Sequence, residues 1–74
     1  MTTTNKLLLA LKARYQAQKA EGIANIEVYM NHPAGIGDHS DIASAVAVEI
    51  AKIAAADDGL LVLEENFSDH IYSE

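Results

Sequence analysis

Apolar side chains recur every three or four residues along most of the chain, and this spacing predicts two long helices. In the first segment, about residues 4–31, they are Leu8, Leu11, Tyr15, Ile26 and Tyr29. In the second, about residues 40–67, they are Ile42, Val46, Ile50, Ile53, Ala56, Leu60, Leu63 and Phe67. We expect residues 68–74 to fray, as chain ends without packing contacts do.

A short break separates the two segments. Residues 32–39 read HPAGIGDH and hold the single proline and two of the four glycines. Pro33 disfavours helical geometry at His32, and the glycines permit a turn. A second weak point, Gly59, follows two aspartates, but the apolar stripe continues in phase beyond it. We therefore predict a turn at residues 32–39 and a second helix that is continuous through Gly59.

The charges indicate how the two helices lie. Four of the five basic residues fall in the first half of the first helix: Lys6, Lys12, Arg14 and Lys19. The second half of the second helix is acidic, with Asp57, Asp58, Glu64, Glu65 and Asp69. A hairpin folded at Ile36 brings these halves together, which predicts an antiparallel pair. This register sets Arg14 beside Asp57 and Gly22 beside Ile50.

Many apolar residues lie off the predicted seam: Leu7, Leu9, Ile23, Val28, Met30, Val48, Leu61 and Val62. Two helices alone cannot cover them, and a large wet apolar patch is unusual on a soluble monomer. The chain has 74 residues and no cysteine, so disulfides cannot compensate for its small core. We expect one all-α domain, 1–74, that self-associates into a four-helix bundle, with a twofold dimer as the first choice.

Composition narrows the function. A net charge of −6 argues against nucleic-acid binding. No apolar run approaches the ~20 residues of a membrane span, and the first residues lack a signal-peptide pattern, so we expect a cytoplasmic protein. Neighbouring acids such as Asp57 and Asp58 do not face each other on a helix, and no nucleophile–base motif is present. The sequence thus predicts a protein that is not an enzyme and needs no cofactor.

The connecting turn is the first candidate site, formed by His32, Gly35, Ile36, Gly37, Asp38 and His39. Backbone N–H groups around Ile36 could bind an anion just before a helix N-terminus. The alternative is a plain turn whose Ile36 packs over the end of the bundle, and Asp38 would repel a phosphate. With Asp41 the two histidines offer metal-ligand chemistry, but their spacing matches no known motif. Helix capping explains the aspartates better, so no metal is predicted.

Two tyrosines on the predicted seam form the second candidate. Tyr15 and Tyr29 are nearly in phase on the first helix and could stack on a base or another flat ligand. Such tyrosines are more often core residues whose hydroxyl reaches the edge of the protein.

Three stretches carry a resemblance to known proteins: residues 29–41 (YMNHPAGIGDHSD), 55–58 (AADD) and 63–67 (LEENF). They resemble a family of short uncharacterised proteins of tailed phages, found in T4-like phages of marine bacteria. The resemblance covers residues 5–67, and the Gly-Ile-Gly-Asp-His turn is its most specific part, whereas Gly59 departs from the helix former expected there. The family has no assigned activity, so the resemblance implies a phage origin and action in the host cytoplasm but no site residues.

The leading hypothesis is therefore a small non-enzymatic interaction protein, an oligomer of itself that binds a host or phage protein. One alternative is an oligomeric binder of a nucleotide-like small molecule, which would use the turn and the tyrosines. Another is a minor virion or assembly protein.

Overall fold

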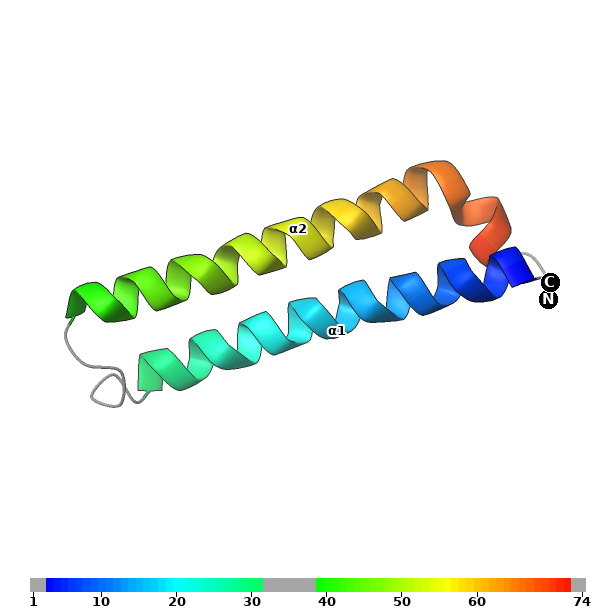
Figure 1. Cartoon of the computed structure of the whole chain (residues 1–74). Helices are drawn as coiled ribbons and strands as arrows, with labels where there is room; N and C mark the ends of the chain where they lie inside the picture. Colours follow the sequence, from blue (N-terminus) through cyan, green and yellow to red (C-terminus); the bar gives the residue numbers. More distant parts are fainter. Residues whose placement is uncertain (1–2, 32–38, 73–74) are drawn as a thin grey trace.

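The fold is an antiparallel pair of long helices (Figure 1). The computed structural model describes residues 3–31 and 39–72, all of them helical. Helix α1 spans Thr3–Asn31 and helix α2 spans His39–Tyr72. The pair measures 50 × 17 × 14 Å, and its radius of gyration is 16.1 Å. A compact domain of this length would have about 11 Å. The predicted all-α helical hairpin is confirmed, and its elongated form leaves little room for an interior.

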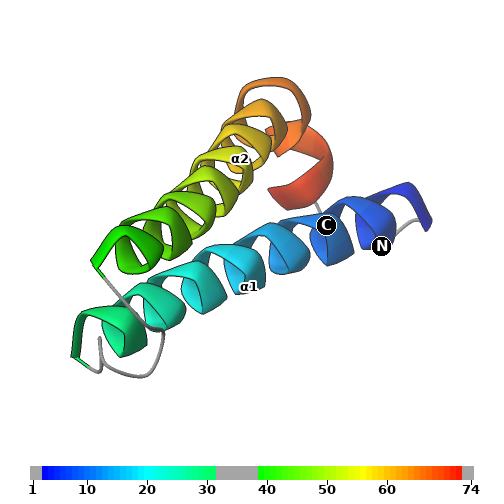
Figure 2. The same ribbon diagram turned by 60° about the vertical axis from the view of Figure 1, so that its left-hand side comes forward.

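Helix α2 runs through Gly59 without a break, as predicted. It does not end near Phe67, however, and the expectation of a frayed tail at residues 68–74 is wrong up to Tyr72. The last turns of α2, red in Figures 1 and 2, bend toward the start of α1. There Ile71 is only 4% exposed and Asn5 only 7% exposed. Burial of Ile71 gives the final turns a packing contact, so they remain helical.

The seam between the helices follows a repeat of seven residues. Its buried and half-buried positions include Leu8, Leu11, Tyr15, Gly22, Asn25, Ile26 and Tyr29 in α1, and Ile42, Val46, Glu49, Ile53, Ala56, Gly59, Leu60 and Leu63 in α2. Steps of three, four and seven residues keep these positions on one side of each helix, as in a coiled coil. Asn25, Glu49 and Gly59 are the members outside the predicted stripes and their expected contacts.

Two members of the predicted stripe lie outside the seam. Ile50 is 55% exposed and Phe67 is 39% exposed. The seam passes through Glu49, and the next residue points about 100° away from it. Beyond Phe67 the last turns of α2 bend toward α1 (Figure 2), and Ile71 in these turns is buried.

The register also differs from the expected one, by about one helical turn. Gly22 lies against Ile53, because a Cβ atom added to the glycine would be 2.7 Å from Ile53 Cγ1. Gly59 lies against Tyr15, whose Cζ would be 2.6 Å from an added Cβ. The predicted contact of Gly22 with a large side chain is therefore present, with Ile53 in place of Ile50. In this register each glycine accommodates a large residue of the other helix.

Asp57 pairs with a different basic residue from the one expected. Its carboxylate lies 2.8 Å from Lys19 Nζ, whereas the expected register set it beside Arg14. The prediction of basic α1 facing acidic α2 is correct in direction and displaced along the helix.

The interior of the hairpin is small. Among the residues that the structure describes, the buried apolar ones are Ala56, Leu63 and Ile71. Nine large apolar side chains of the same ranges are exposed: Leu7, Ile23, Val28, Met30, Val48, Ile50, Leu61, Val62 and Phe67. Seven of them are residues that the sequence placed off the seam. Neither described helix contains a stretch that is both long enough and apolar enough to span a bilayer.

Candidate functional site

The turn proposed as an anion or partner site cannot be built from the structure. His32, Gly35, Ile36, Gly37 and Asp38 lie outside the described residues. His39 begins α2, but its side chain is also outside the description. The role of the turn therefore stays a prediction.

Both tyrosines lie half-buried on the seam, as predicted. The ring of Tyr15 covers Gly59, with three ring carbons within 2.6–2.8 Å of the position that a Cβ would occupy. Tyr29 is 14 residues further along a helix that rises 1.5 Å per residue, so the two rings are about 21 Å apart. They cannot enclose one small ligand within a single chain. Their arrangement fits packing better than ligand stacking.

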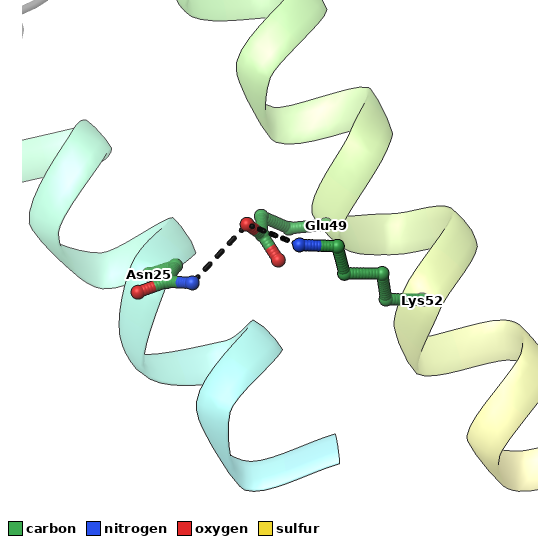
Figure 3. Close-up of polar contacts among 3 residues, drawn as sticks. All are labelled: Asn25, Glu49 and Lys52. Atoms are coloured by element: carbon green, nitrogen blue, oxygen red, sulfur yellow. Dashed lines mark hydrogen bonds and ion pairs between the residues drawn. The ribbon is translucent and has the colours of Figure 1, made fainter. Parts of the chain in front are cut away.

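A polar cluster that the sequence analysis did not foresee crosses the middle of the seam (Figure 3). Asn25 Nδ2 donates a hydrogen bond to Glu49 Oε1 at 3.1 Å, and Lys52 Nζ donates to the same oxygen at 3.4 Å. The Glu49 side chain is 5% exposed, whereas that of Lys52 is 55% exposed. Glu49 Oε2 is buried and accepts no hydrogen bond. An unpaired buried polar atom of this kind costs about 1–3 kcal/mol.

Glu49 was missed because a charged residue is rarely placed in a core. The signal that identifies it is its spacing. It lies seven residues after Ile42 and seven before Ala56, both on the seam. A strict seven-residue repeat passes through Glu49 and excludes Ile50.

One side of the hairpin carries a groove next to this cluster. The groove has a volume of about 350 Å³ and is lined by Gln18, Glu21, Lys52 and Ala55. Val28 lies seven residues after Glu21, and Val48 lies four before Lys52, so both valines follow the same side of their helices. Leu7 lies fourteen residues before Glu21 and Val62 seven after Ala55, so they continue the same side. We call this side the groove face, with Leu7, Gln18, Glu21, Val28, Val48, Lys52, Ala55 and Val62. Its middle is polar, with exposed Val28 and Val48 toward one end and exposed Leu7 and Val62 toward the other.

The opposite side is organised around two isoleucines. Lys19 and Asp57 form an ion pair across the helices, so the rows that contain them lie on one side of the hairpin. Ile23 and Met30 follow Lys19 by four and eleven residues, and Ile50 and Leu61 flank Asp57 by seven and four. We call Lys19, Ile23, Met30, Ile50, Asp57 and Leu61 the Ile23–Ile50 face. Its four apolar side chains are 43%, 66%, 55% and 55% exposed in chain order.

The total exposed area shows how much surface the hairpin leaves open. The chain exposes 5211 Å². A folded monomer of 7.9 kDa would expose about 4400 Å². The difference of roughly 800 Å² equals what one partner contributes to a protein–protein interface of standard size. The elongated hairpin therefore leaves open apolar surface that a compact domain of the same mass would bury.

Within residues 3–31 and 39–72, no three His, Cys, Asp or Glu side chains come together in a way that could hold a metal ion. Compared with known proteins, the chain matches no protein-family model, no curated protein and no solved structure.

Proposed function

We propose that this chain is a small non-enzymatic interaction protein that acts as an oligomer of helical hairpins. The observation that carries the proposal is the set of nine large apolar side chains exposed along α1 and α2. Monomeric soluble proteins rarely expose large apolar patches unless these serve binding.

The energy available from covering this surface is large for so small a protein. Burial of roughly 800 Å² per chain, somewhat more than half of it apolar, gives on the order of 10 kcal/mol before the costs of association. A domain of this size has a total stability of only about 5 kcal/mol. Association is thus a major source of stability for the fold, in place of the disulfides that the chain lacks.

The polar cluster supports a role without catalysis. Glu49 is the one buried carboxylate among the described residues, and it is closed into the seam by Asn25 and Lys52. A catalytic carboxylate must reach its substrate, whereas this one contacts only its own hairpin. Glu49 fits a role in fixing the helix register.

The biological setting that we propose comes from the resemblance to short tailed-phage proteins. The protein would act in the cytoplasm of an infected host and bind a host or phage protein through surfaces that self-association leaves free. The acidic side chains of α2 and the turn are the regions proposed for that second contact.

Native mass spectrometry of gently purified protein, together with light scattering at several concentrations, tests this proposal. We expect a whole multiple of the chain mass, two being the first expectation. A monomer at concentrations of tens of micromolar contradicts the proposal. An oligomer with added mass of a few hundred daltons would instead favour the binder of a nucleotide-like ligand.

A further inference from the structure

The two faces of the hairpin differ in what lies at mid-length. On the Ile23–Ile50 face, the middle holds the two isoleucines and the Lys19–Asp57 ion pair. On the groove face, the middle holds Gln18, Glu21 and Lys52. Stable interfaces have an apolar, desolvated centre and a polar rim. Of the two faces, the Ile23–Ile50 face comes nearer to this distribution, because Ile23 and Ile50 lie beside its middle, whereas the large apolar side chains of the groove face lie toward its ends.

The α2 residues of this face continue as an apolar row. Beside Ile50 and Leu61, the same steps of four and three residues lead through Ala43, Ala47 and Ala54, all of them exposed. Helix α2 therefore carries a second stripe next to the seam, interrupted only by Asp57. Small alanines between larger side chains let a further helix approach closely, as knobs-into-holes packing requires.

The distribution of charge along the hairpin indicates which helix of a second copy would pack on this stripe of α2. The first half of α1 is basic and the second half of α2 is acidic, and both halves lie at the same end of the hairpin. If two hairpins meet with these ends together, α1 of each lies on α2 of the other, and Lys19 lies near Asp57 of the partner subunit. The reversed arrangement sets α1 on α1 and leaves this complementarity unused.

We propose that the Ile23–Ile50 face binds a second copy of this chain, with α1 of each hairpin packed on α2 of the other and their basic–acidic ends together. The inference rests on the proposed self-association and identifies its surface and orientation. A standard interface buries about 800 Å² of each partner. The hairpin exposes roughly that much more surface than a compact monomer of its mass. At the shared height, Ile23 of one chain meets Ile50 of the other.

Cysteine cross-linking tests this contact directly, because the chain has no cysteine of its own. Full-length Ile23→Cys and Ile50→Cys proteins are mixed, one of them labelled with ¹⁵N, and oxidised mildly. Each chain then has one thiol, so every disulfide joins two chains, and mass spectrometry separates mixed from like pairs. Val28→Cys with Val48→Cys is the matched control on the groove face. Circular dichroism confirms that all four variants keep their helices.

We expect mixed Ile23–Ile50 disulfides to form at least about tenfold faster than mixed Val28–Val48 disulfides, because a disulfide requires Cβ atoms about 3.5–4.5 Å apart. Faster reaction of the control pair overturns the choice of face. Like pairs at Ile23 and at Ile50 without mixed pairs overturn the orientation. Both results leave the proposed oligomer standing if the native mass is a multiple of the chain mass. A monomeric mass, or a complex of one chain with a different protein, contradicts the proposal that a second copy covers this face.

Discussion

The middle of the seam and the outer face beside it differ less in apolar content than an interior and a surface usually do. At mid-length the seam contains small or polar residues, Gly22, Asn25, Glu49, Ala56 and Gly59, beside large ones such as Ile26 and Ile53. One residue away on each helix, Ile23 and Ile50 lie outside and are 43% and 55% exposed. This distribution is the one that the proposed packing of the hairpin on a second copy would explain.

This distribution has a physical reason. Glycine and alanine let the helix axes approach, and the contacts Gly22–Ile53 and Gly59–Tyr15 fix the register. Close axes leave little volume between two helices, so several large aliphatic side chains lie on the outside. They gain burial only when another helix pair covers them. Seam variants should therefore change folding, and outer-face variants should change association.

The largest effect on folding is expected at Leu63. This side chain is 4% exposed, and truncation of a buried leucine to alanine costs about 2–5 kcal/mol. Leu63→Ala should lower the free energy of unfolding by that amount in urea titrations. Leu61→Ala, two positions away and 55% exposed, is the matched control. At concentrations below self-association it should cost less than about 1 kcal/mol. Equal losses would show that the seam is no better packed than the outside.

A charge on the outer face should have the next largest effect, and on association. Ile50→Glu places a carboxylate at the centre of the proposed dimer, where its desolvation should weaken association about 100-fold. Val48→Glu puts the same charge on the groove face at a position that is 56% exposed, and should change association only a few-fold. Sedimentation equilibrium measures both dissociation constants. Weakening by Val48→Glu to the same extent would remove the distinction between the faces.

Gly59→Ala tests how tightly the seam is closed. Alanine gains about 1 kcal/mol of helix propensity, but its Cβ would meet the rigid ring of Tyr15 at 2.6–2.8 Å. Overpacking of this kind costs about 1–3 kcal/mol, so we expect a net loss of up to about 2 kcal/mol in thermal or urea unfolding.

The control for this variant removes the ring. In a Tyr15→Ala background, Gly59→Ala should become stabilising, because the propensity gain remains and the clash is gone. Gly22→Ala meets an aliphatic side chain, Ile53, and should come closer to balance. A stabilising Gly59→Ala in the parent protein would mean that Tyr15 does not lie on this glycine.

Helical periodicity was enough to predict the two helices, their antiparallel order and the continuity of α2 through Gly59. It also placed Ile23, Val48 and Leu61 off the seam, because these positions depend only on the 3.6-residue period. It failed at Glu49 and Ile50. Residue type favoured the isoleucine for the interior, whereas the seven-residue phase of the seam selects its neighbour.

The pattern of apolar positions could not predict the register of the two helices or the C-terminal bend of α2, for a different reason. A shift by one turn leaves each stripe in place, so periodicity cannot distinguish the two registers. The contacts of Gly22 with Ile53 and of Gly59 with Tyr15 distinguish them, and these need both helices in three dimensions. Burial of Ile71 likewise depends on a bend that no single helix encodes. The turn at residues 32–38 lies outside the described structure, so its candidate site is untested.

Glu49→Gln should give a moderate loss of stability. The amide oxygen can still accept from Asn25, but the NH₂ group takes the buried place of the unpaired Oε2, and the ion pair with Lys52 is lost. We expect about 1 kcal/mol less stability in urea unfolding, since leaving buried polar groups unpaired costs about 1–3 kcal/mol. Asn25→Ala removes the other partner of the carboxylate and should destabilise as well. A gain in stability in Glu49→Gln would show that the new N–H groups find an acceptor that Oε2 could not use.

The smallest effect concerns the ion pair that reports the register. Lys19 and Asp57 are 42% and 49% exposed in their side chains, so solvent screens their attraction. A double-mutant cycle of Lys19→Ala and Asp57→Ala should give a coupling energy of about 0.2–1 kcal/mol, falling toward zero in ~1 M salt. The same cycle with Arg14→Ala in place of Lys19→Ala should show no coupling, because the observed register separates Arg14 from Asp57. Measurement below self-association isolates the contact within one chain. Coupling to Arg14 instead of Lys19 would restore the register that the charges alone suggested, and would move Gly22 and Gly59 away from Ile53 and Tyr15.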